Sequence, residues 1–290
     1  VLGTTACGKS GLGVELAKRF DGEIVSADSR QVYKGLDLGT GKVTEEEMEG
    51  VPHHMLDVVE PNQPYSVADF QAGAYAAIDD ILARGRTPFL VGGTGLYVRA
   101  VTEGFTFTDA RPDPALRAEL EGKTTEELYA LLREKTGVTL TGGEENNRHR
   151  LMRSVEKALS GRWESPPPCP RYDCLLLGVT FPREEVCRRI DARLQARIDA
   201  GMLDEVADLR ANGATDAFLE GLGLEYRYIL RYLTGQIPTL DGLKDELGRA
   251  IKRFAKRQMV WFKKDRDVLW LDMEGDFLTQ AVRAVEGFLA

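Results

Sequence analysis

The first ten residues carry a complete phosphate-binding pattern. Gly3 to Ser10 read Gly-x-x-x-x-Gly-Lys-Ser, after an apolar dipeptide and before a helix-forming segment. In the order strand, glycine loop and helix, backbone amides and the helix N-terminus converge on phosphate oxygens. Lys9 would reach the outer phosphates and Ser10 would hold Mg²⁺. The pattern predicts phosphate binding, with a chance glycine turn as the alternative, and leaves open whether phosphate is hydrolysed, transferred or displaced.

A carboxylate and a second glycine-rich turn follow the next two predicted strands. The strand from Glu23 ends at Asp28, and the strand 87–91 runs into Gly92, Gly93 and Thr94. Ligands of parallel α/β sheets bind beyond the carboxyl ends of the strands, so we expect these residues beside the first loop. Asp28 would support a metal ion or act as a general base. A turn or capping aspartate is the alternative.

The elements that position these residues predict an α/β fold, with a parallel sheet flanked by helices. We expect a core from 1–183 and 245–290 and a helical insertion at 184–244, with boundaries uncertain by ten residues or more. The expected strands are 23–28, 87–91, 174–180 and 268–272, and the expected helices are 65–82, 113–135, 146–160 and 243–264. Residues 183–232 are expected to be a long helical stretch that is broken near Gly201, Gly213 and Gly221 to Gly223.

Composition is that of an ordinary globular protein, with 43% hydrophobic and 29% charged residues in a chain of 290. No apolar run has the length of a membrane span. The chain begins inside a predicted strand, so we expect a native start upstream. The four cysteines, at 7, 169, 174 and 187, are typical of a reducing compartment, so we expect a cytoplasmic protein. We also expect a monomer.

Charge alone argues against nucleic-acid binding, because the net charge is −8. Two basic clusters nevertheless stand out, one at residues 148–153 and a denser one at 252–266. Taken alone, each is interpreted as a solvated helix face.

Seven segments together resemble the tRNA dimethylallyltransferase family, also called tRNA isopentenyltransferases, over nearly the whole chain. They are Gly3-Thr-Thr-Ala-Cys-Gly-Lys-Ser, Ser26-Ala-Asp-Ser-Arg-Gln-Val-Tyr-Lys, Pro52-His-His-Met-Leu-Asp, Tyr65-Ser-Val-Ala-Asp-Phe, Val91-Gly-Gly-Thr-Gly-Leu-Tyr, Asn146 to Arg153, and Ala255-Lys-Arg-Gln-Met-Val-Trp-Phe. The resemblance implies a core like that of P-loop NTPases. It also implies transfer of a dimethylallyl group from dimethylallyl diphosphate to N6 of adenosine 37, beside the anticodon of tRNA.

The resemblance assigns roles to individual residues. Asp28 matches the general base, Thr94 a residue that supports the diphosphate, and Arg193 an arginine that clamps it. The diphosphate loop comprises Gly3, Thr4, Thr5, Ala6, Cys7, Gly8, Lys9 and Ser10, with Mg²⁺ at Ser10. The residues expected to contact tRNA are Asp28, Ser29, Arg30, Gln31, His149, Arg150, Arg153, Tyr226, Arg227, Lys256, Arg257 and Gln258. RNA contact then becomes the favoured interpretation of both basic clusters.

The chain departs from the family pattern at two positions that bear on the site. Glu225 stands in place of a glycine, and Cys7 stands where many members have serine. A thiol at a helix N-terminus can become reactive, so we expect alkylation of Cys7 to block activity. The adjacent His53 and His54 are interpreted as structural or substrate-positioning residues.

Three other functions are compatible with parts of the sequence. A small-molecule kinase would need an ATP and acceptor-hydroxyl site, for which the sequence holds no specific signal. An adenylate isopentenyltransferase would share the N-terminal motifs, but both basic clusters favour tRNA. A non-catalytic RNA-binding protein is disfavoured by the presence of Lys9, Asp28 and Arg193 together.

Overall fold

The computed structural model describes residues 1–107, 113–140, 144–161, 163 and 166–290. The chain divides into two compact units, Val1–Glu103 with Pro170–Ala290, and Gly104–Cys169. Residues 184–244, where we expect the helical insertion, lie within the first unit. They do so because Ile190, Leu194 and other side chains of these helices share one hydrophobic core with strand residues such as Val25.

The strands of the first unit are all parallel where they pair. They are β1 (Leu2–Gly3), β2 (Gly22–Ser26), β3 (His53–His54), β4 (Thr87–Val91), β5 (Leu177–Thr180) and β6 (Leu269–Asp272). They form two groups, β3-β2-β4 and β1-β5-β6. A parallel bridge between Leu2 and Gly92 connects the groups, and the Gly92 amide donates a hydrogen bond of 3.1 Å to the Val1 carbonyl. The expected parallel α/β sheet is thereby confirmed.

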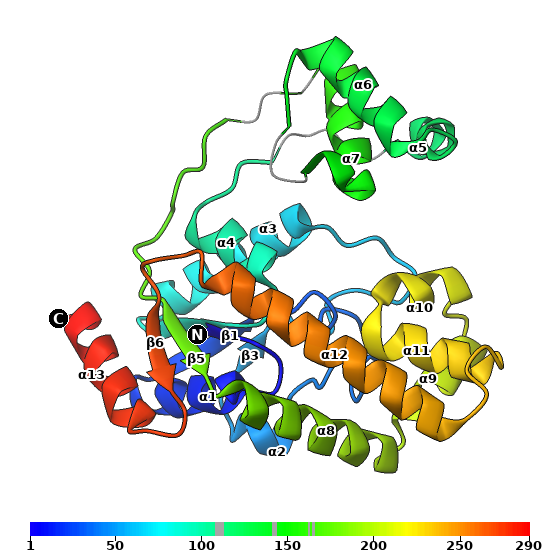
Figure 1. Cartoon of the computed structure of the whole chain (residues 1–290). Coiled ribbons are helices and arrows are strands. Elements are labelled where there is room, and N and C mark those ends of the chain that lie inside the picture. The colour runs from blue at the N-terminus through cyan, green and yellow to red at the C-terminus, as the bar shows by residue number, and fades with distance from the viewer. Residues whose placement is uncertain (108–112, 141–143, 162, 164–165) are drawn as a thin grey trace. The chain divides into compact units, whose positions relative to one another are not determined.

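Helices cover both faces of this sheet (Figure 1). The helices of the first unit are α1 (Lys9–Arg19), α2 (Glu45–Met48), α3 (Val67–Ala83), α4 (Gly95–Thr102), α8 (Arg183–Asp199), α9 (Met202–Ala211), α10 (Asp216–Leu222), α11 (Leu224–Leu233), α12 (Leu240–Phe262) and α13 (Phe277–Leu289), of which α9, α10 and α11 lie to one side of the sheet. Successive strand residues point to opposite faces, so Ile24 packs in the core with Leu16 of α1, and Val25 packs in the core with Phe70 of α3.

Helix α12 places one apolar face on this core. Leu243, Leu247, Ile251, Ala255 and Phe262 recur at helical spacing and are buried. Such a stripe buries one side of a helix and leaves the other to water. The helix therefore carries buried and solvent-facing residues side by side in the sequence.

The second unit is a small helical body with its own core. Its elements are α5 (Pro114–Glu121), α6 (Thr125–Thr136), a 3₁₀ turn (Glu144–Asn146) and α7 (Arg148–Leu159). Leu120, Leu128, Leu132, Leu151 and Val155 form the core between these helices. This separate cluster explains why the segment folds as a unit distinct from the sheet.

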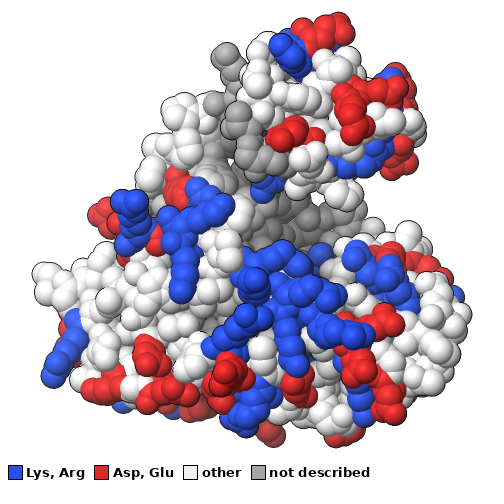
Figure 2. Space-filling view, viewed as in Figure 1, with Lys and Arg blue, Asp and Glu red and all other residues white. Residues whose placement is uncertain are grey.

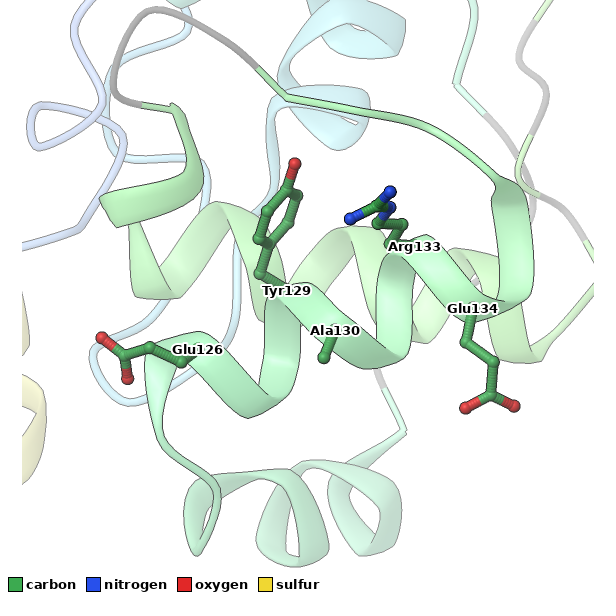
Figure 3. Close-up of a pocket in the computed structure, with 5 residues that line it drawn as sticks. All are labelled: Glu126, Tyr129, Ala130, Arg133 and Glu134. Carbon is green, nitrogen blue, oxygen red and sulfur yellow. The ribbon is translucent and has the colours of Figure 1, made fainter.

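A shallow hollow lies on the surface of α6 within the second unit (Figure 3). It is lined by Glu126, Tyr129, Ala130, Arg133 and Glu134. None of these residues belongs to the predicted site.

Candidate active site

The phosphate loop leads directly into an uncapped helix N-terminus. Gly8 precedes α1 with φ at 83°, a left-handed conformation that glycine adopts without strain. Among the residues that the structure describes, none caps the first turn of α1 with its side chain, and no acidic residue lies in that turn. The amides of this turn therefore remain available to an anion, which the helix dipole also attracts.

Lys9 and Ser10 lie in this first turn. The Lys9 ammonium is 3.4 Å from the Thr4 carbonyl, so the side chain folds back along the loop. Within the described part of the chain, no group hydrogen-bonds to the half-buried Ser10 hydroxyl. In the same ranges, no cluster of three or more His, Cys, Asp or Glu side chains forms a metal cage.

Thr94, in the second glycine-rich turn, is connected to the segment after β2. The Thr94 hydroxyl accepts a hydrogen bond of 3.0 Å from the Ser29 amide, and the Thr94 amide donates one of 3.2 Å to the Ala27 carbonyl. The structure thus brings Thr94 beside Asp28, as expected from the meeting of strand ends.

Asp28 is half-buried and forms a turn with its own backbone. Its Oδ1 accepts a hydrogen bond of 2.9 Å from the Arg30 amide. This is the turn role that the sequence offered as the alternative for Asp28, and it uses one carboxylate oxygen. Since the bond fixes the carboxylate at the sheet edge, it is compatible with a role as a base.

Helix α8 presents three arginines to the loops at intervals of four residues, which places them on one helix face. Arg189 Nε donates a hydrogen bond of 2.8 Å to the Ala6 carbonyl, and the Arg193 guanidinium donates to the Thr5 hydroxyl. Arg197 lies 3.8 Å from the carboxylate of Glu225 in α11. Arg193 therefore reaches the phosphate loop, as the sequence interpretation required of a clamp.

The Arg193 side chain is half-buried, and its guanidinium faces the phosphate loop. Burial lowers the pKa of Arg193 to about 10, and repulsion by Arg197 acts in the same direction. A cation that is partly removed from water and lacks a close carboxylate is stabilised when an anion binds beside it. The charge is therefore placed where a diphosphate would stabilise it.

Gln258 occupies a position that differs from its expected contact with tRNA. Its side chain is buried, with Oε1 accepting a hydrogen bond of 2.9 Å from the Thr5 amide and Nε2 donating one of 2.8 Å to the Gly93 carbonyl. Both polar groups are used within the protein. The structure therefore places Gln258 as a bridge between the two glycine loops.

Tyr226 faces the protein, whereas Arg227 is half-exposed and contacts Glu220. Tyr226 is 2% exposed, and its hydroxyl donates a hydrogen bond of 2.9 Å to Glu205. Arg227 donates hydrogen bonds of 2.8 and 3.0 Å to the Glu220 carbonyl. Burial leaves Tyr226 no surface for RNA, so it is a core residue here.

Lys256 and Arg257, in contrast, are exposed on the polar face of α12. They continue a basic stripe with Arg249, Lys252 and Arg253, spaced three or four residues apart. Figure 2 shows Lys and Arg side chains gathered on the face over α8 and α12. We call these five residues the α12 basic stripe.

The remaining basic residues expected to contact RNA lie on α7 in the second unit. His149 and Arg150 are exposed, and Arg153 is half-buried with its guanidinium 3.1 Å from Glu156. Arg30 and Gln31 lie in the first unit, after Asp28. The Gln31 amide donates a hydrogen bond of 3.1 Å to the Gly41 carbonyl.

The expected reactivity of Cys7 is not supported by its environment. The side chain is 1% exposed, and its Sγ donates a hydrogen bond of 2.7 Å to the Thr4 carbonyl. A reagent cannot reach a thiol enclosed in this way. Cys7 is therefore a packing residue of the loop.

Sequence reasoning missed Arg189, Arg197 and the bridging role of Gln258. The signal for the arginines was present as the four-residue spacing from Arg189 through Arg193 to Arg197. For Gln258, the signal was its place on the apolar stripe of α12, three residues after Ala255 and four before Phe262.

The fold and site define a class: an α/β protein with a phosphate-binding loop whose anion site is completed by arginines from a separate helix. Family comparison refines this class. The model of the IPP transferase family matches residues 31–265, and that of isopentenyl transferase matches residues 1–60. The chain belongs to the IPP transferase family.

Relatives match along the whole chain. A tRNA dimethylallyltransferase of Oceanobacillus iheyensis is 38% identical, covering 100% of this chain and 95% of its own length. The tRNA dimethylallyltransferase 2 of Shewanella sediminis is 42% identical, covering 97% of this chain and 95% of its own length.

Solved structures agree with this relationship. The full-length tRNA isopentenylpyrophosphate transferase of Bacillus halodurans has a TM-score of 0.74 and 38% identity, covering 99% of this chain and 93% of that chain. A eukaryotic dimethylallyltransferase acting on tRNA has a TM-score of 0.80 and 25% identity. The match covers 99% of this chain and 77% of that chain. The P-loop NTPase-like core expected from the sequence is confirmed. In the described ranges, no helix is long and apolar enough to span a membrane.

Proposed function

We propose that this protein transfers a dimethylallyl group from dimethylallyl diphosphate to N6 of adenosine 37 in tRNA, and releases diphosphate. The observation that carries the proposal is the contact of the half-buried Arg193 guanidinium with the Thr5 hydroxyl of the phosphate loop. This contact sets a cation against the same loop that carries Lys9. Membership of the IPP transferase family supports a prenyl donor rather than ATP.

In the proposed reaction the adenine N6 attacks the allylic carbon. A carbon–nitrogen bond forms, the carbon–oxygen bond breaks, and the electron pair leaves with the diphosphate. Lys9, Arg193 and the loop amides neutralise the charge that develops on this leaving group. Preorganised electrostatic stabilisation of this kind often contributes more to catalysis than any other single effect.

Asp28 is the proposed general base that accepts the N6 proton. The Arg30 amide donates a hydrogen bond of 2.9 Å to one carboxylate oxygen, which fixes the orientation of the carboxylate. Thr94 is proposed to support the diphosphate and, through the Ser29 amide, to fix the segment that carries Asp28. An exocyclic amine is a weak nucleophile, so this orientation contributes much of the rate.

Mg²⁺ fits the first turn of α1. The Ser10 hydroxyl has no protein partner in the described ranges, and Mg²⁺ in phosphate sites is usually held by few protein oxygens together with the substrate. We propose that Ser10 holds it. When bound, the ion adds positive charge to the diphosphate oxygens.

The tRNA is proposed to bind along the α12 basic stripe. Five cations at helical spacing, with Arg253, Lys256 and Arg257 exposed, match a polyanionic backbone better than a free mononucleotide. The adenine must leave its stack to reach Asp28, so base flipping is part of the proposal. His149, Arg150 and Arg153 remain proposed contacts from the second unit.

One labelling experiment tests the proposal against its alternatives. The protein is incubated with radiolabelled dimethylallyl diphosphate and either tRNA or AMP. We expect label in tRNA, lost when a tRNA with guanosine at position 37 is used. Label in AMP alone would indicate an adenylate isopentenyltransferase. In a parallel reaction with labelled ATP, phosphate transfer would indicate a kinase. Absence of label from both tRNA and AMP would contradict the proposal.

A further inference from the structure

Glu225 and Arg197 form a buried charged pair beside the diphosphate clamp. The Arg197 Nη1 and Glu225 Oε1 atoms are 3.8 Å apart, and each side chain is 14% exposed. Glu225 lies in the first turn of α11, directly after the turn at Gly223. The separation is too long for a hydrogen bond, so neither group is firmly held by the other.

The pair belongs to the same electrostatic cluster as the clamp. Arg193 is repelled by Arg197 and attracted by Glu225. Burial raises the pKa of the Glu225 carboxyl, and Arg197 and Arg193 act in the opposite direction. Glu225 is thus an acid that acts on both cations, and its charge opposes theirs at the site where diphosphate binds.

Arg197 has a second neighbour that limits its position. A Cβ atom at Gly41 would overlap the Arg197 guanidinium, so this glycine makes room for it. The Gly41 carbonyl also accepts a hydrogen bond of 3.1 Å from the Gln31 amide, in the segment after Asp28. Arg197 therefore lies between Gly41 and Glu225, four residues along α8 from Arg193.

We propose that the Arg197–Glu225 pair tunes the diphosphate clamp: Glu225 limits the affinity for diphosphate, and Arg197 prevents Glu225 from drawing Arg193 away from Thr5. Both are positioning residues. The inference rests on the proposed function, because it assumes that diphosphate is the ligand of the clamp. A diphosphate affinity tuned in this way would let the site bind the prenyl donor and still release the diphosphate product.

The two partners should have opposite effects on binding. Glu225→Gln leaves Arg193 and Arg197 without their opposing charge, so inorganic diphosphate should bind about tenfold more tightly, by Coulomb's law at the effective dielectric of a protein. Arg197→Gln frees Glu225 to attract Arg193, so diphosphate should bind about tenfold more weakly. The double variant removes both charges and should lie close to the wild type.

The test is calorimetric titration with inorganic diphosphate and Mg²⁺ at about pH 8, above the ordinary range of a carboxyl pKa. Thermal unfolding of each variant accompanies it. In turnover, Glu225→Gln should lower both the donor KM and kcat, since product release slows. Glu225→Asp, which keeps the charge, should retain most of the wild-type affinity. If Glu225→Gln does not fold, the tenfold weaker binding expected of Arg197→Gln tests the pair by itself.

The matched control is Glu220→Gln, which removes the same charge from a residue of α10. Glu220 is half-exposed and pairs with Arg231 at 2.5 Å. It should leave diphosphate affinity unchanged. Equal shifts in one direction for both Glu225→Gln and Arg197→Gln, or no shift, would overturn the inference while leaving prenyl transfer intact. Failure of the wild type to bind diphosphate would overturn the proposed function as well.

Discussion

The side chain of Gln258 accepts a hydrogen bond of 2.9 Å from the backbone amide of Thr5. Through its other end it donates one of 2.8 Å to the Gly93 carbonyl, in the second glycine-rich turn. One buried amide of α12 thus joins two loops that are far apart in the sequence. This bridge supports their relative position, together with the pairing of Leu2 and Gly92.

Replacing Gln258 by leucine should therefore loosen the site. The change leaves a buried donor and a buried acceptor unpaired, each at a cost of about 1–3 kcal/mol in free energy of unfolding. Chemical denaturation measures this loss, and steady-state kinetics should show a raised donor KM. Lys256→Gln is the control, because the neighbouring side chain is exposed and should leave the stability unchanged within about 0.5 kcal/mol. Equal stability of both variants would contradict the bridge.

The local parts of the fold were predictable from sequence. The phosphate loop, the strands at 22–26 and 87–91, and the long helix ending at Phe262 follow from glycine spacing and apolar periodicity. These signals depend on neighbours in the chain. The catalytic roles of Asp28, Thr94 and Arg193 came from resemblance and stay predictions.

The division into units was not predictable in the same way. Amphipathic helices occur both in 113–160 and in 183–233, and their patterns do not say which core they join. Tertiary packing decides this: Leu128 and Leu151 pack with one another, whereas Ile190 shares the core of the sheet. Gln258 follows the exposed Lys256 and Arg257 in the sequence, but its position on the apolar face of α12 determines its burial.

Asp28→Asn tests the general base with little structural change. The amide oxygen of asparagine can still accept the bond from the Arg30 amide, so the turn should persist. Without a carboxylate, kcat should fall by about 10²–10⁴, the usual contribution of general base catalysis. Single-turnover transfer to tRNA measures the rate, and filter binding should show unchanged tRNA affinity. Asp37→Asn, at an exposed acid paired with Lys42, should keep wild-type turnover. A wild-type rate for Asp28→Asn would remove Asp28 from this role.

Lys256→Ala tests whether the α12 basic stripe contacts RNA. Loss of one phosphate contact should weaken tRNA binding and reduce the slope of log K against log salt by about one. Diphosphate affinity should not change, because Lys256 is an exposed residue of the opposite helix face from Gln258. Arg283→Ala removes an exposed cation from α13, outside the stripe, and should leave the salt slope as it is. Identical slopes for both variants would argue against the stripe as the tRNA site.

Glu23 is a buried acid whose ionisation connects the stability of the fold to pH. Its side chain is 2% exposed, and its carboxylate accepts hydrogen bonds from His54 at 2.6 Å and from Arg86 at 2.6 Å, and also pairs with Arg84. The Arg84 guanidinium above all, with help from His54 and Arg86, holds the pKa of Glu23 well below its ordinary value. The folded state therefore favours the ionised form more strongly than the unfolded chain does.

Glu23→Gln should consequently destabilise the protein by about 2–4 kcal/mol near neutral pH, since it leaves the arginines without their buried acid. A carboxyl whose pKa is lowered on folding contributes stability that is fully present above its unfolded pKa, about 4.3, and is lost as pH falls toward the folded pKa. The difference between wild type and Glu23→Gln should thus be constant above about pH 5 and shrink in more acidic solution. Urea denaturation across this range measures it. Glu49→Gln, at an exposed acid paired with Lys18, should cost no more than about 1 kcal/mol. A difference that grows on acidification would contradict the assignment of Glu23 as an ionised buried anchor.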